Sequence, residues 1–153
     1  MTHTLHRKGT RESLNRDYIF LCMAAKGINE DGADDKMREF LRIVIKHGAV
    51  NIGDMRTGNI FCCNPEEIIG KVTSTSIVHG VFTDPATVTK VMKSLKKANL
   101  GMSVVVSGPF SSVEEMCKKA GIKPHSVDYS AGIWGRTEKL ARLELLECTT
   151  MCG

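Results

Sequence analysis

Residues 18–25 read YIFLCMAA, an unbroken apolar run with the length of one strand. Continuous rather than alternating hydrophobicity is typical of a strand that is covered on both faces, as in a parallel sheet. Glycine and polar residues over 26–32 then predict a turn. After this turn, apolar residues recur at helical spacing at Met37, Phe40, Leu41, Val44 and Ile45. This part of the chain therefore predicts a strand followed by a helix.

The alternation of strand and helix continues along the chain. Further strand-like apolar segments lie at 49–52, 76–82, 102–106, 125–129 and 143–148. Helix starts are indicated by Asn64-Pro65, by Asp84-Pro85, and by Ser112 with Glu115 as a capping box. The helix that follows Asp84 is expected to extend to about residue 100, near Gly101.

Repeated strand–helix units predict an α/β fold. The expected architecture is a three-layer sandwich with a mainly parallel sheet, Rossmann- or flavodoxin-like, because parallel strands need crossover helices. The alternative is a ferredoxin-like α+β two-layer sandwich. That alternative requires residues 49–61 and 76–83 to form an antiparallel pair of neighbours.

Composition and charge indicate one globular domain with a basic arm. The chain has 153 residues, of which 42% are hydrophobic and 25% charged, and its net charge is +4. Four basic residues and one acidic residue give residues 1–16 a net charge of +3, so these residues are interpreted as a flexible N-terminal arm. Residues 17–153 are interpreted as a single domain. Because no covering element follows the apolar segment 143–148, the sequence leaves open whether the domain is complete at its C-terminus.

The same features guide the expected location and partners. A near-neutral body argues against nucleic-acid binding, and no stretch has the roughly 18 uncharged apolar residues that a membrane span needs. The N-terminus lacks the apolar core of a signal peptide, so a cytoplasmic location is expected. The unfinished segment 143–148 predicts a homo-oligomer, with a homodimer as its simplest form.

The six cysteines are expected to be reduced thiols. They show no Cys-x-x-Cys spacing, and no metal site is expected. A metal site remains as the weaker alternative, with the ligand set Cys62, Cys63, Cys148 and Cys152. No cofactor is indicated.

Ligands of parallel sheets bind where the strands end. Applied here, this rule gathers three cations, several polar residues and the single tryptophan, which are Lys26, Arg56, Asp84, Ser107, Gly108, Trp134 and Arg136. Cations near glycine-rich turns and helix N-termini indicate an anionic ligand, a phosphate or a carboxylate. The first hypothesis is therefore a binding domain for a small anion, either regulatory or a subunit of a larger enzyme.

Two further hypotheses come from other classes of protein. An enzyme would use Asp54 and His79, or the thiols of Cys62-Cys63. An assembly protein would use the segment 143–148 and the loop around Trp134 as an oligomer interface.

Overall fold

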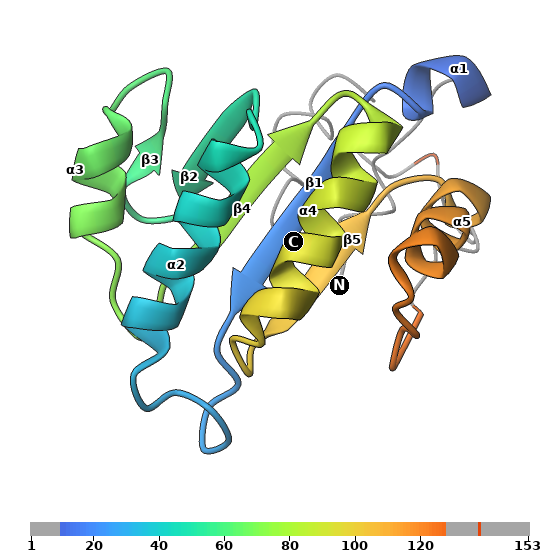
Figure 1. Cartoon of the computed structure of the whole chain (residues 1–153). Coiled ribbons are helices and arrows are strands. Elements are labelled where there is room, and N and C mark those ends of the chain that lie inside the picture. Colours follow the sequence, from blue (N-terminus) through green and yellow to red (C-terminus); the bar gives the residue numbers. More distant parts are fainter. Residues whose placement is uncertain (1–9, 128–137, 139–153) are drawn as a thin grey trace.

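A computed structural model describes residues 10–127 and 138, and Figure 1 shows its elements. The five strands are β1 (Tyr18–Met23), β2 (Asn51–Asp54), β3 (Gly58–Asn59), β4 (Ile77–Phe82) and β5 (Ser103–Ser107). The helices are α1 (Arg11–Leu14), α2 (Ala33–Lys46), α3 (Pro65–Gly70), α4 (Pro85–Ala98) and α5 (Phe110–Ala120). The strands form one sheet in the order β3-β2-β4-β1-β5, and every neighbouring pair is antiparallel.

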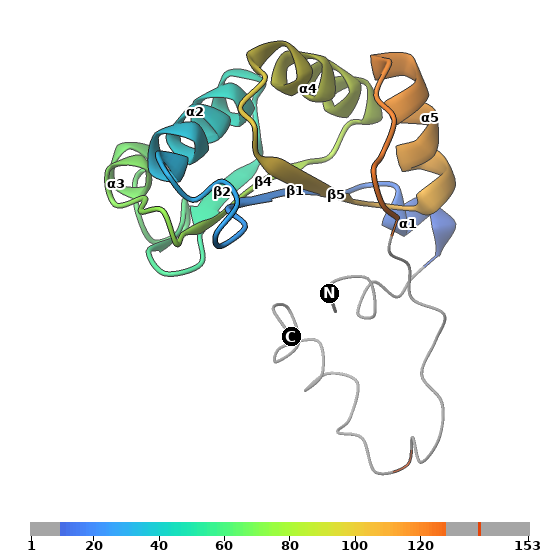
Figure 2. The same ribbon diagram turned by 90° about the horizontal axis from the view of Figure 1, so that it is seen from below.

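The expected three-layer sandwich with a mainly parallel sheet is therefore wrong. Helices α2, α4 and α5 lie on the same face of the sheet, which gives two layers (Figure 2). β2 and β4 are antiparallel neighbours, as the ferredoxin-like alternative required. The path β1-α2-β2-β4-α4-β5 is compatible with that alternative, and β3 with α3 is an insertion between β2 and β4.

The misleading feature is the apolar run of β1. Its side chains alternate between the two faces of the sheet. Tyr18, Phe20 and Cys22 are buried under the helices, whereas Leu21 is half-buried and Met23 is 41% exposed on the opposite face. The strand is thus apolar on both faces, although the long helices cover only one of them. The composition of the strand does not show which face is covered.

The core lies between the sheet and the three long helices. The predicted helical stripe is confirmed in α2, where Met37, Phe40, Leu41 and Val44 are fully buried. The fifth member of that stripe, Ile45, is 37% exposed at the edge of the contact. Across the sheet, Phe20 and Phe82 stack edge to face with ring centroids 5.6 Å apart, and an arrangement of this kind adds to the stability of a buried aromatic pair.

Helix starts were predicted correctly where a capping residue precedes proline. The Asp84 side chain accepts a hydrogen bond from Thr87 N at 2.7 Å, and Asn64 accepts one from Glu67 N at 2.8 Å. The expected capping box at Ser112 is wrong, because α5 begins earlier in the chain, at Phe110. The side chain of Ser112 instead donates to Asn15 Oδ1 at 2.6 Å.

The chain ends are described only in part. Within the basic arm 1–16, residues Arg11–Leu14 form α1, and residues 1–9 lie outside the description. Residues 125–127 of the fifth predicted strand are not extended in a sheet, and the predicted strand 143–148 lies outside the described residues. No helix in the described part of the chain combines the length and apolar character needed to cross a bilayer.

Candidate functional site

The antiparallel sheet divides the residues that were expected to share one rim. Met23, at the end of β1, pairs with Ile77 and Ser103, at the starts of β4 and β5. The loops after β1 and β2, which hold Lys26 and Arg56, therefore lie at one end of the sheet. The loops after β4 and β5 lie at the other end. Because a parallel sheet was the premise of the single rim, that rim is not formed.

The remaining predicted ligand residues fall at the second end or outside the description. Asp84 follows β4, Ser107 is the last residue of β5, and Gly108 follows it. A Cβ at Gly108 would lie 2.7 Å from Tyr18 Cδ1, so glycine is needed here for packing. Trp134 and Arg136 lie outside the described residues.

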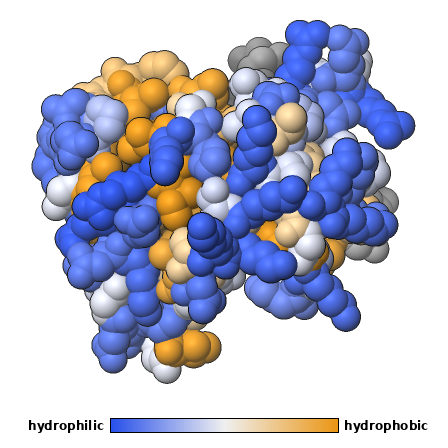
Figure 3. Space-filling model, viewed as in Figure 1, coloured by the Kyte–Doolittle hydropathy of each residue, from blue (hydrophilic) through white to orange (hydrophobic). Residues whose placement is uncertain are grey.

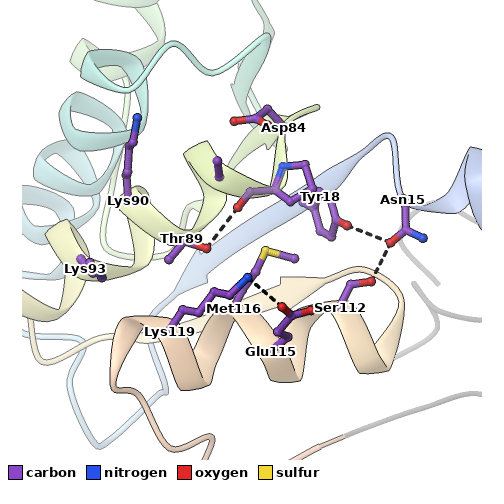
Figure 4. Close-up of a pocket in the computed structure, with 12 residues that line it drawn as sticks. Asn15, Tyr18, Asp84, Thr89, Lys90, Lys93, Ser112, Glu115, Met116 and Lys119 are labelled. Carbon is purple, nitrogen blue, oxygen red and sulfur yellow. Dashed lines mark hydrogen bonds and ion pairs between the residues drawn. The ribbon is translucent and has the colours of Figure 1, made fainter.

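A groove of about 630 Å³ lies between α4 and α5 at this second end (Figure 4). Its lining comes from the end of α1, the start of β1, α4 as far as Lys93 and one face of α5. It consists of Asn15, Tyr18, Asp84, Pro85, Ala86, Thr89, Lys90, Lys93, Ser112, Glu115, Met116 and Lys119. On the helix face of the molecule, hydrophilic side chains surround a smaller apolar patch on the α4–α5 side (Figure 3). The groove is thus apolar at its base and polar at its rim.

The base of the groove is held by a small polar network. Asn15 Oδ1 accepts hydrogen bonds from the Tyr18 hydroxyl at 3.0 Å and from Ser112 Oγ at 2.6 Å. This amide links the segment between α1 and β1 to α5, where Ser112 lies 97 residues further along the chain. Tyr18 is fully buried and Met116 is 4% exposed, so both side chains form a fixed floor.

Some charged groups of the rim have partners within the fold and others do not. Glu115 pairs with Lys119 at 2.7 Å, and this lysine holds the pKa of the Glu115 carboxyl below its usual value. The Asp84 carboxylate is engaged by Thr87, whose side-chain and backbone hydrogen bonds lower the pKa of Asp84. Lys90 and Lys93 form no ion pair with any described residue. Among the described residues, these two lysines of the rim thus have no ion-pair partner, although the charge of Lys90 contributes to the lowered pKa of Asp84.

Sequence reasoning missed this groove except for Asp84. Lys90 and Lys93 stand one helical turn apart on α4, and that spacing is readable in the sequence. The sequence contains no signal, however, that α5 packs beside α4 and turns those lysines into one wall of a groove. That neighbourhood follows from the order of the sheet, in which β5 lies next to β1.

A second cluster lies at the corner formed by β2, β3 and α3. Asp54 is 2% exposed, and its Oδ2 accepts from Thr57 Oγ1 at 3.2 Å and Ser76 Oγ at 3.1 Å. Its Oδ1 is buried and has no hydrogen-bond partner within the described part of the chain. In this position, Asp54 joins the end of β2 to the turn that precedes β4.

His79 extends from the face of the sheet opposite to that of Asp54. It lies opposite Gly53 in the register, and successive side chains of a strand point to opposite faces. Burial lowers the pKa of His79, and the charge of Asp54 opposes this shift. A Cβ at Gly53 would be 2.5 Å from His79 Cε1, so the imidazole packs directly over the β2 backbone.

Cys62 and Cys63 lie in the loop between β3 and α3, and both are free thiols. Their sulfur atoms are 3.8 Å apart. Cys62 Sγ donates to Asn59 O at 3.2 Å and accepts from Asn59 N at 3.3 Å, while Cys63 Sγ donates to Thr57 O at 3.4 Å. The hydrogen bond with Cys62 is the main cause that raises the pKa of Cys63.

The four cysteines of the alternative metal set are thus only partly placed. The structure brings Cys62 and Cys63 together, whereas Cys148 and Cys152 lie outside the described residues. Within the described residues, no three His, Cys, Asp or Glu side chains are grouped to hold a metal ion. Cys22 is buried in β1, and burial raises its pKa to about 12, so it remains a protonated core thiol.

Comparison with protein-family models, with curated proteins and with solved structures gives no match.

Proposed function

We propose that the groove between α4 and α5 binds a small anionic molecule, a phosphate or a carboxylate. The observation that carries this proposal is the pair of unpaired lysines, Lys90 and Lys93, at the rim of a groove with an apolar floor. A regulatory domain, or a subunit of a larger cytoplasmic enzyme, is the role that such a site suits. The proposal keeps the anionic ligand expected from the sequence and moves its site.

The balance of charge in the groove favours an anion. Its lining contains the two carboxylates of Asp84 and Glu115 and the three ammonium groups of Lys90, Lys93 and Lys119. Both carboxylates already have partners within the fold. Asp84 keeps its charge because Thr87 is neutral, so these five groups sum to +1. A groove with a net positive charge that is open to solvent attracts an oxyanion.

The floor of the groove adds a second requirement. Pro85, Ala86 and Met116 contribute apolar surface, and the Tyr18 ring lies beneath them. Small-molecule sites commonly combine an apolar lining with a few polar groups that orient the ligand. We therefore propose a ligand with an anionic group and an apolar body, such as an aromatic carboxylate or a phosphate ester.

Isothermal titration calorimetry with inorganic phosphate, phenyl phosphate and benzoate tests this proposal. Ion pairs at exposed sites contribute up to about 1 kcal/mol each, so the Lys90→Ala/Lys93→Ala double variant is expected to weaken binding about 5- to 30-fold. The matched control is Lys97→Ala, an exposed lysine of α4 outside the groove. Failure of all three compounds to bind, or equal affinity of the double variant and the control, contradicts the proposal.

Assembly with a second copy is the other candidate function. Among the described strand residues, the face of the sheet opposite the long helices carries His79 but no Asp, Glu, Lys or Arg. Its apolar side chains are Ile19, Leu21, Met23, Ile77, Val81 and Val105. An apolar face that is not covered by α2, α4 or α5 suits contact with another copy. Light scattering over a range of protein concentrations tests this candidate, and a monomer throughout contradicts it.

A further inference from the structure

The adjacent thiols of Cys62 and Cys63 are arranged as a pair of metal ligands. Both sulfur atoms lie on the same side of the loop, against the β2–β3 turn, and their separation is 3.8 Å. Two thiolates bound at about 2.3 Å to one tetrahedral zinc ion stand about 3.8 Å apart. The side chains of neighbouring residues thus already have the spacing that one such ion requires.

A disulfide is a poorer account of this geometry. Its sulfur atoms bond at about 2.05 Å, and neighbouring cysteines reach that distance only if the loop backbone rearranges. Each sulfur instead has a backbone partner, at Asn59 or Thr57, that holds it in place. These contacts fix the positions of the two sulfur atoms.

The backbone supports a sulfur ligand in a second way. Asn59 N–H donates to Cys62 Sγ at 3.3 Å. Hydrogen bonds from backbone N–H groups to thiolate sulfur stabilise the negative charge and are among the interactions that adjust metal–thiolate sites. This donor is part of the β3 strand itself, so the fold supplies it before any ion binds.

Gly58 makes room for the pair. Its φ is +109°, and a Cβ at this position would lie 2.5 Å from Cys62 Sγ and 3.8 Å from Cys63 Sγ. Both the backbone conformation and the close approach of the sulfur atoms therefore require glycine.

The site is open to solvent on its outer side. Cys62 is exposed, Cys63 is half-buried, and the neighbouring Phe61 is 82% exposed. Figure 3 shows apolar surface gathered on the side of the molecule that carries α2, α3 and β3 in Figure 1. An ion bound here is reachable by a further ligand from outside.

We propose that Cys62 and Cys63 together chelate one thiophilic divalent cation such as Zn²⁺, with the remaining coordination positions filled by water molecules from solvent. Two metal–sulfur bonds form, the two S–H protons pass to solvent, and no electron is transferred. Soft thiolate ligands select zinc and similar ions over Mg²⁺ or Ca²⁺. This site lies apart from the α4–α5 groove and does not depend on the proposed anion binding.

Titration of the reduced, metal-free full chain with Cd²⁺ under anaerobic conditions tests the proposal. The ultraviolet thiolate-to-cadmium charge-transfer absorption is expected to saturate at one ion per chain. Cys62→Ser and Cys63→Ser should each lower the affinity at least tenfold, whereas Cys117→Ser, which alters a buried thiol of α5, should leave it unchanged. Circular dichroism spectra of each variant establish that the fold is intact.

A separate variant tests the two cysteines that lie outside the described residues. The Cys148→Ser/Cys152→Ser double variant should keep a saturable signal. Loss of that signal in the double variant overturns the claim that Cys62 and Cys63 chelate the ion by themselves. A signal that survives in Cys62→Ser and Cys63→Ser overturns the proposal.

A glycine substitution tests the geometry without removing a thiol. Gly58→Ala places a methyl group against Cys62 Sγ and should lower the affinity for Cd²⁺ at least tenfold. Gly48→Ala is the matched control, because Gly48 also has a positive φ of +75° but has no atom within 4 Å of an added Cβ. Equal affinity of the two variants for Cd²⁺ overturns the claim that the sulfur arrangement itself creates the site.

Discussion

Asp54 has two carboxylate oxygens in different surroundings. Oδ2 accepts hydrogen bonds from Thr57 and Ser76, whereas Oδ1 is buried without a partner. A buried oxygen that accepts hydrogen bonds from two hydroxyl groups holds together the segments that carry them. Here these segments are the β2–β3 turn and the turn before β4. The sequence pointed to Asp54 as a catalytic carboxylate, and its contacts also give it a structural role.

Removing this carboxylate should destabilise the protein. Asp54→Ala leaves the hydroxyl of Ser76 buried without its acceptor, and an unsatisfied buried polar group costs about 1–3 kcal/mol. Urea unfolding measures the change in the free energy of unfolding. Asp31→Ala, at an exposed aspartate, is the control and should change it by less than about 0.5 kcal/mol. Equal stability of the two variants would contradict the anchoring role.

His79 should make the stability depend on pH. Burial lowers its pKa in the folded state below the ordinary value of 6.5, so the unfolded state binds more protons on acidification. The free energy of unfolding should therefore fall as the pH drops through 6.5, and the loss should end below the lowered pKa. Urea unfolding at a series of pH values checks this, and His79→Gln should remove part of the slope. An unchanged slope in His79→Gln would assign the pH dependence to other groups.

At the scale of elements, α2 is placed by its contact with β4. Gly80 lies on the helix face of β4, and a Cβ there would be 3.0–3.3 Å from three atoms of the Val44 side chain. The missing side chain allows the helix to approach the sheet closely. The buried stripe of α2 can then cover the centre of the sheet.

Adding a methyl group at this contact should push the two elements apart. Gly80→Ala is expected to cost about 1–3 kcal/mol, as overpacking of a core does. Combining it with Val44→Ala should relieve the clash, with a coupling of at least about 0.5 kcal/mol in a double-mutant cycle measured by urea unfolding. Gly70→Ala is the control, because an added Cβ there has no neighbour within 4 Å. Strict additivity of the Gly80 and Val44 changes would contradict the close approach.

At the scale of the whole molecule, local patterns were informative and long-range pairing was not. The spacing of Met37 to Val44 predicted α2, and the cap at Asp84 with the expected end near Gly101 predicted α4 to within about two residues at each end. The antiparallel direction of the strands could not be predicted from the sequence. The side chains of β1 are apolar on both faces, and this pattern does not show which face a helix covers. A strand with one open apolar face therefore resembled a strand buried in a parallel sheet.

The same distinction explains what could be predicted of the sites. Cys62 and Cys63 are neighbours in the sequence, so the thiols were named in advance, although their spacing and contacts with Asn59 depend on the folded loop. Lys90 gains its significance only because α5 lies beside α4. The periodicity of one segment does not show which distant segment packs against it.

The arrangement of the sheet separates the groove from the thiol pair. From β3 to β1 there are three steps in the strand order, which is about 14 Å at about 4.8 Å per step. Asp54, beside the thiol loop, lies level with Cys22, and Tyr18 of the groove is four residues further along β1, about 13 Å away. The two sites are therefore about 20 Å apart, beyond the screening length of about 8 Å at physiological salt.

The two proposed sites should consequently bind their ligands independently. The affinity for phenyl phosphate is expected to change less than twofold when Cd²⁺ saturates the thiols, because charges at this distance are screened and no described side chain belongs to both sites. By linkage, phenyl phosphate should change the affinity for Cd²⁺ by the same factor. Calorimetric titration of each ligand with the other present at saturation measures both factors, and Cys62→Ser supplies the metal-free reference. A shift of tenfold or more in either titration would mean that the rigid sheet does not isolate the sites, and that an element spanning from β3 to α5 changes conformation when one ligand binds.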